Sequence, residues 1–239
     1  MEDKLFTSLK LREEEEIVLD AGCGDASVAI YLAGKMKGGR LHAMDVLEGQ
    51  VSAARKRVTE EMLKKNDEER TEVIVRQGDY HQLPFEDSSL TAIYTIETLV
   101  HATDLKRVLG EFYRVLRPGG RVALYEYDHW SGSREAEGMD KVRLYGAISG
   151  NEAISGNDRK NGDGQGLGGM LGKVGFVEIQ EEDITANVKP LLRFFCYCLY
   201  LPYLLVVGLG LEHFFINTVA VVVNYRNPWR YVAVTAVKG

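Results

Sequence analysis

The chain has few cysteines, few prolines and no excess of positive charge. Its 239 residues include 3 Cys and 5 Pro, and 29 Lys and Arg stand against 35 Asp and Glu, a formal net charge of −6. So few cysteines exclude a disulfide framework, and the sequence has no CxxC motif or Cys/His cluster typical of a metal site. An acidic chain offers no basic face to phosphate backbones, so we expect no metal and no nucleic-acid partner.

The sequence also lacks a Pro/Ser-rich linker and any internal repeat. With 45% hydrophobic residues it can bury one good core, which predicts a single domain, residues 1–239. The first four residues lack the basic and then apolar pattern of a signal peptide. We therefore expect a reducing, intracellular location, the cytoplasm.

A glycine turn is the most informative motif that is present. The Gly22–Gly24 turn follows an apolar run, residues 17–21, and leads into a helix-like stretch, residues 25–36. Strand, glycine turn and helix in this order are typical of a nucleotide-binding turn, because the backbone can approach a ligand closely and the first helical N–H groups face it. The dinucleotide fingerprint needs a third glycine at position 27, where Ser27 stands. The turn is therefore typical of a nucleotide-binding site but lacks the fingerprint of an NAD-binding site.

Acidic residues follow the next two predicted strands. The strand predicted at residues 40–44 ends at Asp45, about twenty residues after the glycine turn, where a carboxylate can accept hydrogen bonds from a ribose diol. The apolar run at residues 73–75 is followed by Asp79. Parallel strands would deliver both carboxylates to one sheet edge, an arrangement that suits an adenosine.

Strand and helix patterns alternate along the middle of the chain, as a doubly wound sheet requires. Apolar residues recur at spacings of three and four in residues 51–62 and 105–116. This predicts two amphipathic helices, the second capped by Thr103 or Asp104 and closed at Pro118–Gly120. Further strands are predicted at residues 121–127, 176–182 and 230–237.

Three segments together resemble the class I S-adenosylmethionine (SAM) methyltransferases. They read VLDAGCG at residues 18–24, GDYHQLPF at residues 78–85 and VLRPGGR at residues 115–121. Within that superfamily, YTIETLVHA at residues 94–102 and LYE at residues 124–126 look like the sterol C-24 methyltransferases and their small-molecule relatives. The resemblance implies an α/β fold with a doubly wound, mostly parallel seven-stranded sheet, whose last strand is antiparallel and pairs beside the sixth.

The resemblance also implies a SAM site. The loop at residues 20–24 would lie along the methionine portion, Asp45 would hold the ribose hydroxyls, and Asp79 with the Tyr80 backbone would contact the adenine amine. A plain turn-forming role is the alternative for Asp45 and Asp79. The expected cofactor-binding residues are Asp20, Gly22, Cys23, Gly24, Asp45, Val46, Asp79, Tyr80 and Glu97.

Glu97 and His101 follow the fourth predicted strand, whose apolar run comes after Leu90 and Thr91, and methyl donor and acceptor should meet there. Histidine exchanges protons near neutral pH and a desolvated glutamate does so too, so both are candidate catalytic bases. In sterol methyltransferases the corresponding positions line the active site, and C-methylation passes through a carbocation that aromatic rings can stabilise. Alternatively, Glu97 accepts backbone hydrogen bonds and His101 packs at a helix start. The candidate aromatic residues for the substrate are Tyr94, Tyr125, Tyr127, Trp130, Tyr197 and Tyr203.

Two unusual segments occupy the last third of the chain. Residues 150–169 are rich in glycine and polar residues, which favours a loop, either a lid or a surface insertion. Residues 194–211 carry no charge and reach the length of a membrane span, but Pro202 and two glycines interrupt them and the chain must return to the sheet. We predict an apolar insertion, residues 185–228, that covers a lipophilic substrate or touches an intracellular membrane surface. A buried helix pair and a homodimer surface are the alternatives.

The sequence therefore predicts a SAM-dependent methyltransferase that releases S-adenosylhomocysteine (SAH). Its acceptor is expected to be a lipophilic small molecule, a sterol, terpenoid or related secondary metabolite, with C-methylation favoured. A quinone-ring C-methyltransferase, a SAM-binding module without transfer activity and an NAD-dependent reductase are the alternatives. Only 16 residues precede Ile17, whereas such enzymes usually carry further helices there. We expect either that the chain is shortened at this end or that the apolar insertion and a partner subunit complete the pocket.

Overall fold

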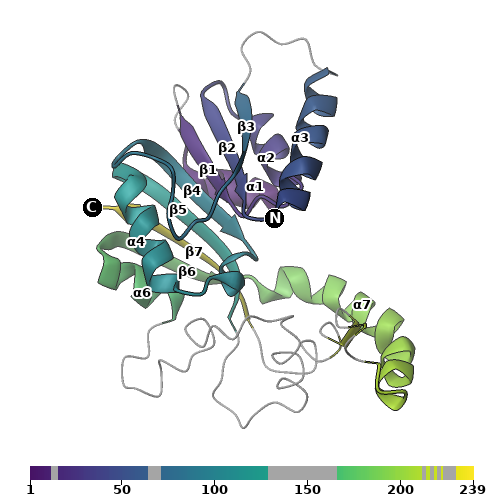
Figure 1. The fold of residues 1–239 in the computed structure, drawn as a ribbon. Helices are drawn as coiled ribbons and strands as arrows, with labels where there is room; N and C mark the ends of the chain where they lie inside the picture. Colours follow the sequence, from purple (N-terminus) through teal and green to yellow (C-terminus); the bar gives the residue numbers. More distant parts are fainter. Residues whose placement is uncertain are drawn as a thin grey trace.

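The computed structural model describes residues 1–11, 16–63, 71–128, 166–211, 214–215, 218–219, 222 and 230–239. Within these residues, seven strands form one sheet in the order β3-β2-β1-β4-β5-β7-β6 (Figure 1). The pairs among β1 to β5 are parallel, and β7 runs antiparallel between β5 and β6. This confirms the predicted doubly wound, mostly parallel seven-stranded sheet with an antiparallel last strand.

The elements follow the predicted order. The strands are β1 (Ile17–Ala21), β2 (Arg40–Asp45), β3 (Glu72–Gln77), β4 (Leu90–Ile96), β5 (Leu116–Asp128), β6 (Phe176–Asp183) and β7 (Arg230–Lys238). The helices are α1 (Glu2–Leu9), α2 (Ser27–Ala33), α3 (Glu48–Leu63), the 3-10 helix η1 (Leu99–His101), α4 (Leu105–Val115), α6 (Leu167–Val174) and α7 (Thr185–Gly208). The prediction of a glycine-rich loop over residues 150–169 is wrong for its last three residues, because α6 begins at Leu167. Residues 150–165 of the predicted loop lie outside the described residues.

Helices cover both faces of the sheet, and the core is split accordingly. Helices α1, α2 and α3 lie on one face, while α4 and α6 lie on the other (Figure 1). Side chains alternate between the two layers along each strand: in β1, Val18 faces the α1/α2 layer and Leu19 faces the α4/α6 layer. Because the central strands are buried on both faces, they read as nearly continuous apolar runs in the sequence.

Helix α1 was not predicted from the sequence. Its side chains Leu5 and Leu9 are fully buried against the sheet face that carries Tyr94 and Tyr125. The amphipathic signal of eight residues is short, so only the packing against β5 and α2 reveals the helix. The segment before β1 therefore supplies part of the core.

Helix α7 leads away from the sheet and is mostly exposed (Figure 1). It is 24 residues long and apolar enough to cross a membrane, judged by length and composition. The expectation that Pro202 interrupts the apolar run is wrong, since α7 continues through Pro190 and Pro202 to Gly208. Only 11% of its most apolar window is buried within the described part of the chain, which disfavours a buried helix pair there. Most of the predicted insertion after residue 211 lies outside the described residues.

Candidate functional site

The carboxyl ends of β1, β2 and β4 meet at one edge of the sheet because these strands are parallel neighbours. In sheets of this class, ligands bind in the crevice outside that edge. The segments that leave the strands there carry most of the predicted site residues. The structure thus brings the glycine turn, Asp45 and the Glu97–His101 segment to the same edge.

The glycine turn is bonded to the end of β2. The backbone N–H groups of Gly22 and Cys23 both donate to the carbonyl oxygen of Met44, at 2.8 and 2.9 Å. Gly22 has a φ of +95°, and a Cβ atom at this position would overlap the Thr98 side chain. Position 22 therefore requires glycine for two reasons: its backbone is left-handed, and the turn after β4 approaches it closely.

Asp45 joins the same turn through its side chain. Its Oδ2 accepts from the backbone N–H of Gly24 at 3.0 Å, and its Oδ1 accepts from that of Leu47 at 2.9 Å. Each carboxylate oxygen can accept a second hydrogen bond, so the turn-forming role leaves capacity for ligand hydroxyls. The neighbouring apolar side chains Val46 and Leu47 are 59% and 61% exposed. This combination can hold a ribose through its hydroxyls and a base through apolar contact.

Asp20 lies behind the turn and is buried. Its Oδ2 accepts from the Tyr94 hydroxyl at 2.8 Å, within the core. Burial raises the pKa of Asp20 to about 7, and the nearby charge of Asp45 acts in the same direction against the Tyr94 hydrogen bond. The Tyr94 hydroxyl is therefore occupied by its hydrogen bond to Asp20, and the Tyr94 ring is fully buried. The predicted contact of this ring with a substrate is thus wrong.

The segment after β3 is fixed by a histidine. Asp79 Oδ1 accepts from the backbone N–H of His81 at 2.8 Å and lies 2.6 Å from His81 Nδ1. On the other side of the ring, Nε2 accepts from the backbone N–H groups of Thr103 and Asp104 at 3.2 and 3.3 Å. Because backbone N–H groups only donate, Nε2 carries no proton in this arrangement and Nδ1 donates to Asp79.

His81 thus ties the predicted adenine loop to the start of α4. Burial acts to raise the pKa of Asp79, but the hydrogen bonds from His81 outweigh it and hold that pKa below its usual value. The neighbouring Tyr80 donates its hydroxyl to the Thr98 carbonyl oxygen at 3.2 Å, and burial raises the pKa of Tyr80 to about 12. The sequence left His81 without an assigned role, since two of its partners, Thr103 and Asp104, follow it by more than twenty residues.

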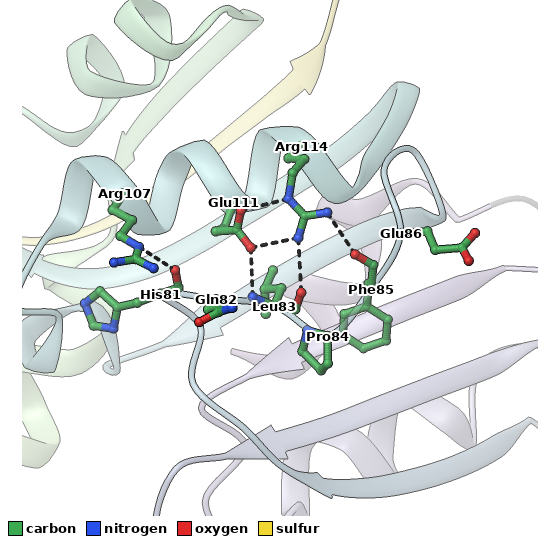
Figure 2. A pocket seen from close by; sticks show the side chains of 9 residues that line it. All are labelled: His81, Gln82, Leu83, Pro84, Phe85, Glu86, Arg107, Glu111 and Arg114. Carbon is green, nitrogen blue, oxygen red and sulfur yellow. Dashed lines mark hydrogen bonds and ion pairs between the residues drawn. The ribbon is translucent and has the colours of Figure 1, made fainter.

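A cavity of about 570 Å³ lies beside this loop, between residues 81–86 and α4 (Figure 2). Arg114 donates to the carbonyl oxygens of Leu83 and Phe85 at 3.1 and 2.9 Å and pairs with Glu111 at 2.7 Å. Glu111 in turn accepts from the Leu83 backbone N–H at 2.8 Å. These polar groups pair with one another, so the network anchors the loop to α4. None of the predicted cofactor residues lines this cavity.

Glu97 begins the turn after β4. Its backbone is left-handed, with a φ of +54°, and its N–H donates to the Tyr125 carbonyl oxygen at 2.9 Å. The residue is exposed, yet partial burial of its carboxyl group raises its pKa, while a hydrogen bond with Tyr231 acts in the opposite direction. A non-glycine residue held at positive φ is uncommon and is found preferentially at functional sites.

Two aromatic rings lie close to Glu97. The Tyr127 and Tyr231 rings meet edge to face, with centroids 4.8 Å apart. They come together because the antiparallel strand β7 places Tyr231 opposite Tyr127 at the end of β5. Sequence reasoning selected Tyr127 and missed Tyr231, whose only signal was its place at the start of an alternating strand.

Glu126 is a second buried acid at this edge and is 1% exposed. Its Oε1 accepts from the Thr95 hydroxyl at 2.9 Å and from the backbone N–H groups of Thr98 and Leu99 at 3.2 Å each. Burial raises the pKa of Glu126 to about 7 against these hydrogen bonds. Glu126 therefore holds the start of η1, whose last residue, His101, is exposed.

This edge does not include three of the remaining predicted substrate residues, Tyr125, Tyr197 and Tyr203. Tyr125 is fully buried between the sheet and α1, so a contact with an acceptor would require α1 to move. Tyr197 and Tyr203 lie on α7, roughly 18 Å or more along the helix axis from its first residue. Trp130 lies outside the described residues. The roles given to these four residues stay predictions.

Known proteins resemble this chain at the level of sequence and of structure. A family model described as a methyltransferase domain matches residues 19–124. The S-adenosyl-L-methionine-dependent Diels-Alderase iccD of Talaromyces variabilis is 33% identical over 242 residues, which cover 100% of this chain and 80% of that protein. The sterol 24-C-methyltransferase of Pneumocystis carinii is 33% identical over 180 residues, which cover 74% of this chain and 44% of that protein. The chain thus spans less than half the length of this sterol methyltransferase.

A solved structure shows the same fold over the whole chain. It is the geranyl diphosphate C-methyltransferase of Streptomyces coelicolor A3(2), in complex with Mg2+, geranyl diphosphate and S-adenosyl-L-homocysteine. Its TM-score is 0.71 at 18% identity, with 100% of this chain and 76% of that chain covered.

Asp45→Ala should weaken SAM binding by about 1.5–3 kcal/mol, roughly ten- to a hundredfold in Kd, because we expect the Asp45 carboxylate to accept a charge-assisted pair of hydrogen bonds from the ribose. Calorimetric titration measures this directly. Glu48→Ala is the matched control, since Glu48 is an exposed acid three residues later that pairs with Arg55 at 3.6 Å and accepts from the Ser52 hydroxyl at 3.2 Å. An unchanged Kd for Asp45→Ala would refute the ribose assignment.

Proposed function

Since this chain belongs to the family of SAM-dependent methyltransferases, we propose that it transfers the methyl group of SAM to a carbon atom of a lipophilic small molecule. The family and the cofactor are as the sequence predicted. The proposed acceptor is a sterol, a terpenoid or a related secondary metabolite. A quinone belongs in the same acceptor screen, because the sequence left a quinone-ring methyltransferase open.

The residues at the sheet edge fit a SAM molecule. A Cβ atom at Gly24 would meet nothing within 4 Å, so this part of the turn borders open space. The Asp45 carboxylate would hold the ribose, and the exposed Val46 and Leu47 would lie against the adenine. Asp20 would lie near the methionine portion, whose ammonium group favours a charged carboxylate.

The observation that carries the acceptor chemistry is the acidic and aromatic group at the same edge. Glu97 presents a carboxylate, and the half-buried Tyr127 presents a ring beside it, while the fully buried Tyr231 ring supports Tyr127 from behind. Such surroundings stabilise a cation through charge and ring faces. They suit an acceptor that becomes cationic during the reaction, as an alkene does when it is methylated on carbon.

SAM supplies an electrophilic methyl group, so the π electrons of the acceptor form the new carbon–carbon bond and the sulfur keeps the electron pair of the broken one. Glu97 would then take the proton that the resulting carbocation must lose. Its raised pKa makes it a stronger base than an ordinary carboxylate. Glu126 would act as a positioning residue, because it holds the backbone of the turn on which Glu97 and His101 are displayed.

A second candidate function is an intramolecular [4+2] cyclisation. It is favoured by the match to the SAM-dependent Diels-Alderase, which covers 80% of that protein, against 44% of the sterol methyltransferase. A cycloaddition rearranges bonds within one substrate and transfers no methyl group. The two functions therefore differ in whether SAM is consumed.

Incubation with SAM and a panel of sterols, linear terpenoids and quinones should give one SAH per product molecule, with the product heavier by one methylene. Chromatography with mass detection measures both. A product of unchanged mass, formed without SAH, would replace the proposal by the cyclase. SAM binding without turnover of any acceptor in the panel would contradict methyl transfer to these classes.

Glu97→Gln should lower kcat by about 10²–10⁴-fold, the usual contribution of a positioned base. In the unaltered enzyme the rate should fall on the acid side as Glu97 is protonated, and its raised pKa shifts this fall above the usual range of a glutamate. The acid-side fall should be absent in the variant. Steady-state kinetics against pH measure both effects, with Glu48→Gln as the control.

An increase in the SAM Kd at unchanged kcat would instead assign Glu97 to cofactor binding, the other role that the sequence suggested for it.

A further inference from the structure

Helix α7 has no task in the proposed chemistry, yet it is the largest exposed apolar feature of the described chain. Its side chains Tyr197, Leu201 and Leu205 are 68%, 71% and 67% exposed. Soluble monomers rarely leave so much contiguous apolar surface in water. The other exposed apolar residues of the helix are Leu191, Phe194, Phe195, Tyr200, Leu204 and Val207.

The exposed apolar side chains surround most of the helix. At 3.6 residues per turn, those from Phe194 to Val207 occupy an arc of roughly 240°. Cys196 and Val206, the two buried residues, lie on the remaining side. A helix that packs on one partner surface needs an apolar stripe of only about 100°. A lid contact or a second copy of the chain would therefore leave much of this surface in water, whereas lipid can surround it.

The charges of α7 agree with a lipid environment. Lys189 and Arg193 are its only charged residues, and both precede the charge-free run. The Arg193 guanidinium lies over the Tyr197 ring, 5.7 Å from its centroid. Basic side chains next to aromatic rings are typical of the headgroup level, with an apolar stretch beyond them in the acyl chains.

The sheet topology excludes a single crossing of the membrane. Strand β6 precedes α7 and strand β7 follows it, and the two strands pair with each other. Both ends of the segment are thus held on the same side of any bilayer. A connection of this kind lets α7 enter a bilayer only if the chain returns to the same side before β7.

The N-terminal end of α7 lies at the edge of the candidate site. The Ile184 N–H donates to the Tyr231 carbonyl oxygen at 2.8 Å, and the Tyr231 N–H donates to the Thr185 hydroxyl at 2.8 Å. Tyr231 is also the partner of Glu97. An α7 held in lipid would therefore keep the acceptor side of the site at the membrane surface.

We propose that α7 inserts into one leaflet of a lipid bilayer, with Lys189 and Arg193 at the level of the headgroups. Membrane insertion of α7 does not depend on the proposed acceptor, so its test is independent of the test for methyl transfer. Since the formal net charge of the chain is −6, apolar contact must supply most of the attraction. Binding should then occur on neutral vesicles and increase only modestly with anionic lipid.

Flotation of the full chain with vesicles tests the proposal. The protein should float with phosphatidylcholine vesicles, and slightly more with added phosphatidylserine. The double variant Leu201→Glu/Leu205→Glu should lose flotation, because two charges enter the acyl region. Val177→Glu is the matched control: Val177 is an apolar residue on β6 that is 47% exposed, and this variant should float like the unaltered chain. Unchanged SAM affinity of the double variant confirms that it is folded.

The exposed thiol of Cys198 reports on insertion independently. A maleimide coupled to polyethylene glycol should label it in solution and should fail to do so once vesicles are added, while Cys198→Ser identifies the labelled site. A protein that stays unbound on both kinds of vesicle, or a double variant that floats as well as the unaltered chain, overturns the proposal. A dimer seen by light scattering that the double variant dissociates, without flotation, overturns it too and assigns the surface to a second copy.

Discussion

The site depends on one cluster of hydrogen bonds, in which the glycine turn is bound to the end of the neighbouring strand. Two backbone N–H groups of the turn share the Met44 carbonyl oxygen, and a third reaches the Asp45 carboxylate. The turn then approaches Thr98 so closely that only glycine fits at position 22. Thr98 is held in turn by Glu126, which fixes η1. The glycine turn and η1 are thus joined through backbone groups together with the side chains of Asp45, Thr98 and Glu126.

Two buried carboxyl groups stand on either side of this cluster. Burial raises the pKa of both Asp20 and Glu126 to about 7, so each is poised between its neutral and charged forms near neutral pH. A positive charge nearby lowers such a pKa and releases a proton. The methionine ammonium of SAM would act on Asp20 in this way, and a cationic acceptor would act on the acids after β4 and β5. Perturbed acids of this kind are frequent at catalytic sites.

The sequence was sufficient for what depends on local pattern. The apolar runs predicted the order of the strands along the chain, because parallel strands leave continuous apolar segments, and the glycine turn predicted a nucleotide-like ligand. SAM itself was implied by the resemblance of three segments to the class I methyltransferases. Pro202 misled the prediction, since α7 continues through a residue that usually breaks a helix. Proline lowers helix propensity locally, but it does not decide the outcome in a strongly apolar segment.

What the sequence could not provide are the contacts between distant residues. Tyr231 reaches Glu97 because β7 is inserted antiparallel between β5 and β6, a pairing that spans more than a hundred residues. His81 and Glu126 act on backbone groups of turns that follow or precede them at a distance. Nothing in the spacing of these residues indicates such bonds.

The central claim is that a SAM molecule lies along the glycine turn beside Asp20. Calorimetric titration with SAM, SAH and NADH, in two buffers of different ionisation enthalpy at neutral pH, tests it most directly. SAM and SAH should bind and NADH should not, and the heats in the two buffers should differ by the release of protons, because the bound ammonium lowers the pKa of Asp20 from about 7. Binding of NADH, absence of SAM binding, or SAM binding without proton release would contradict the account.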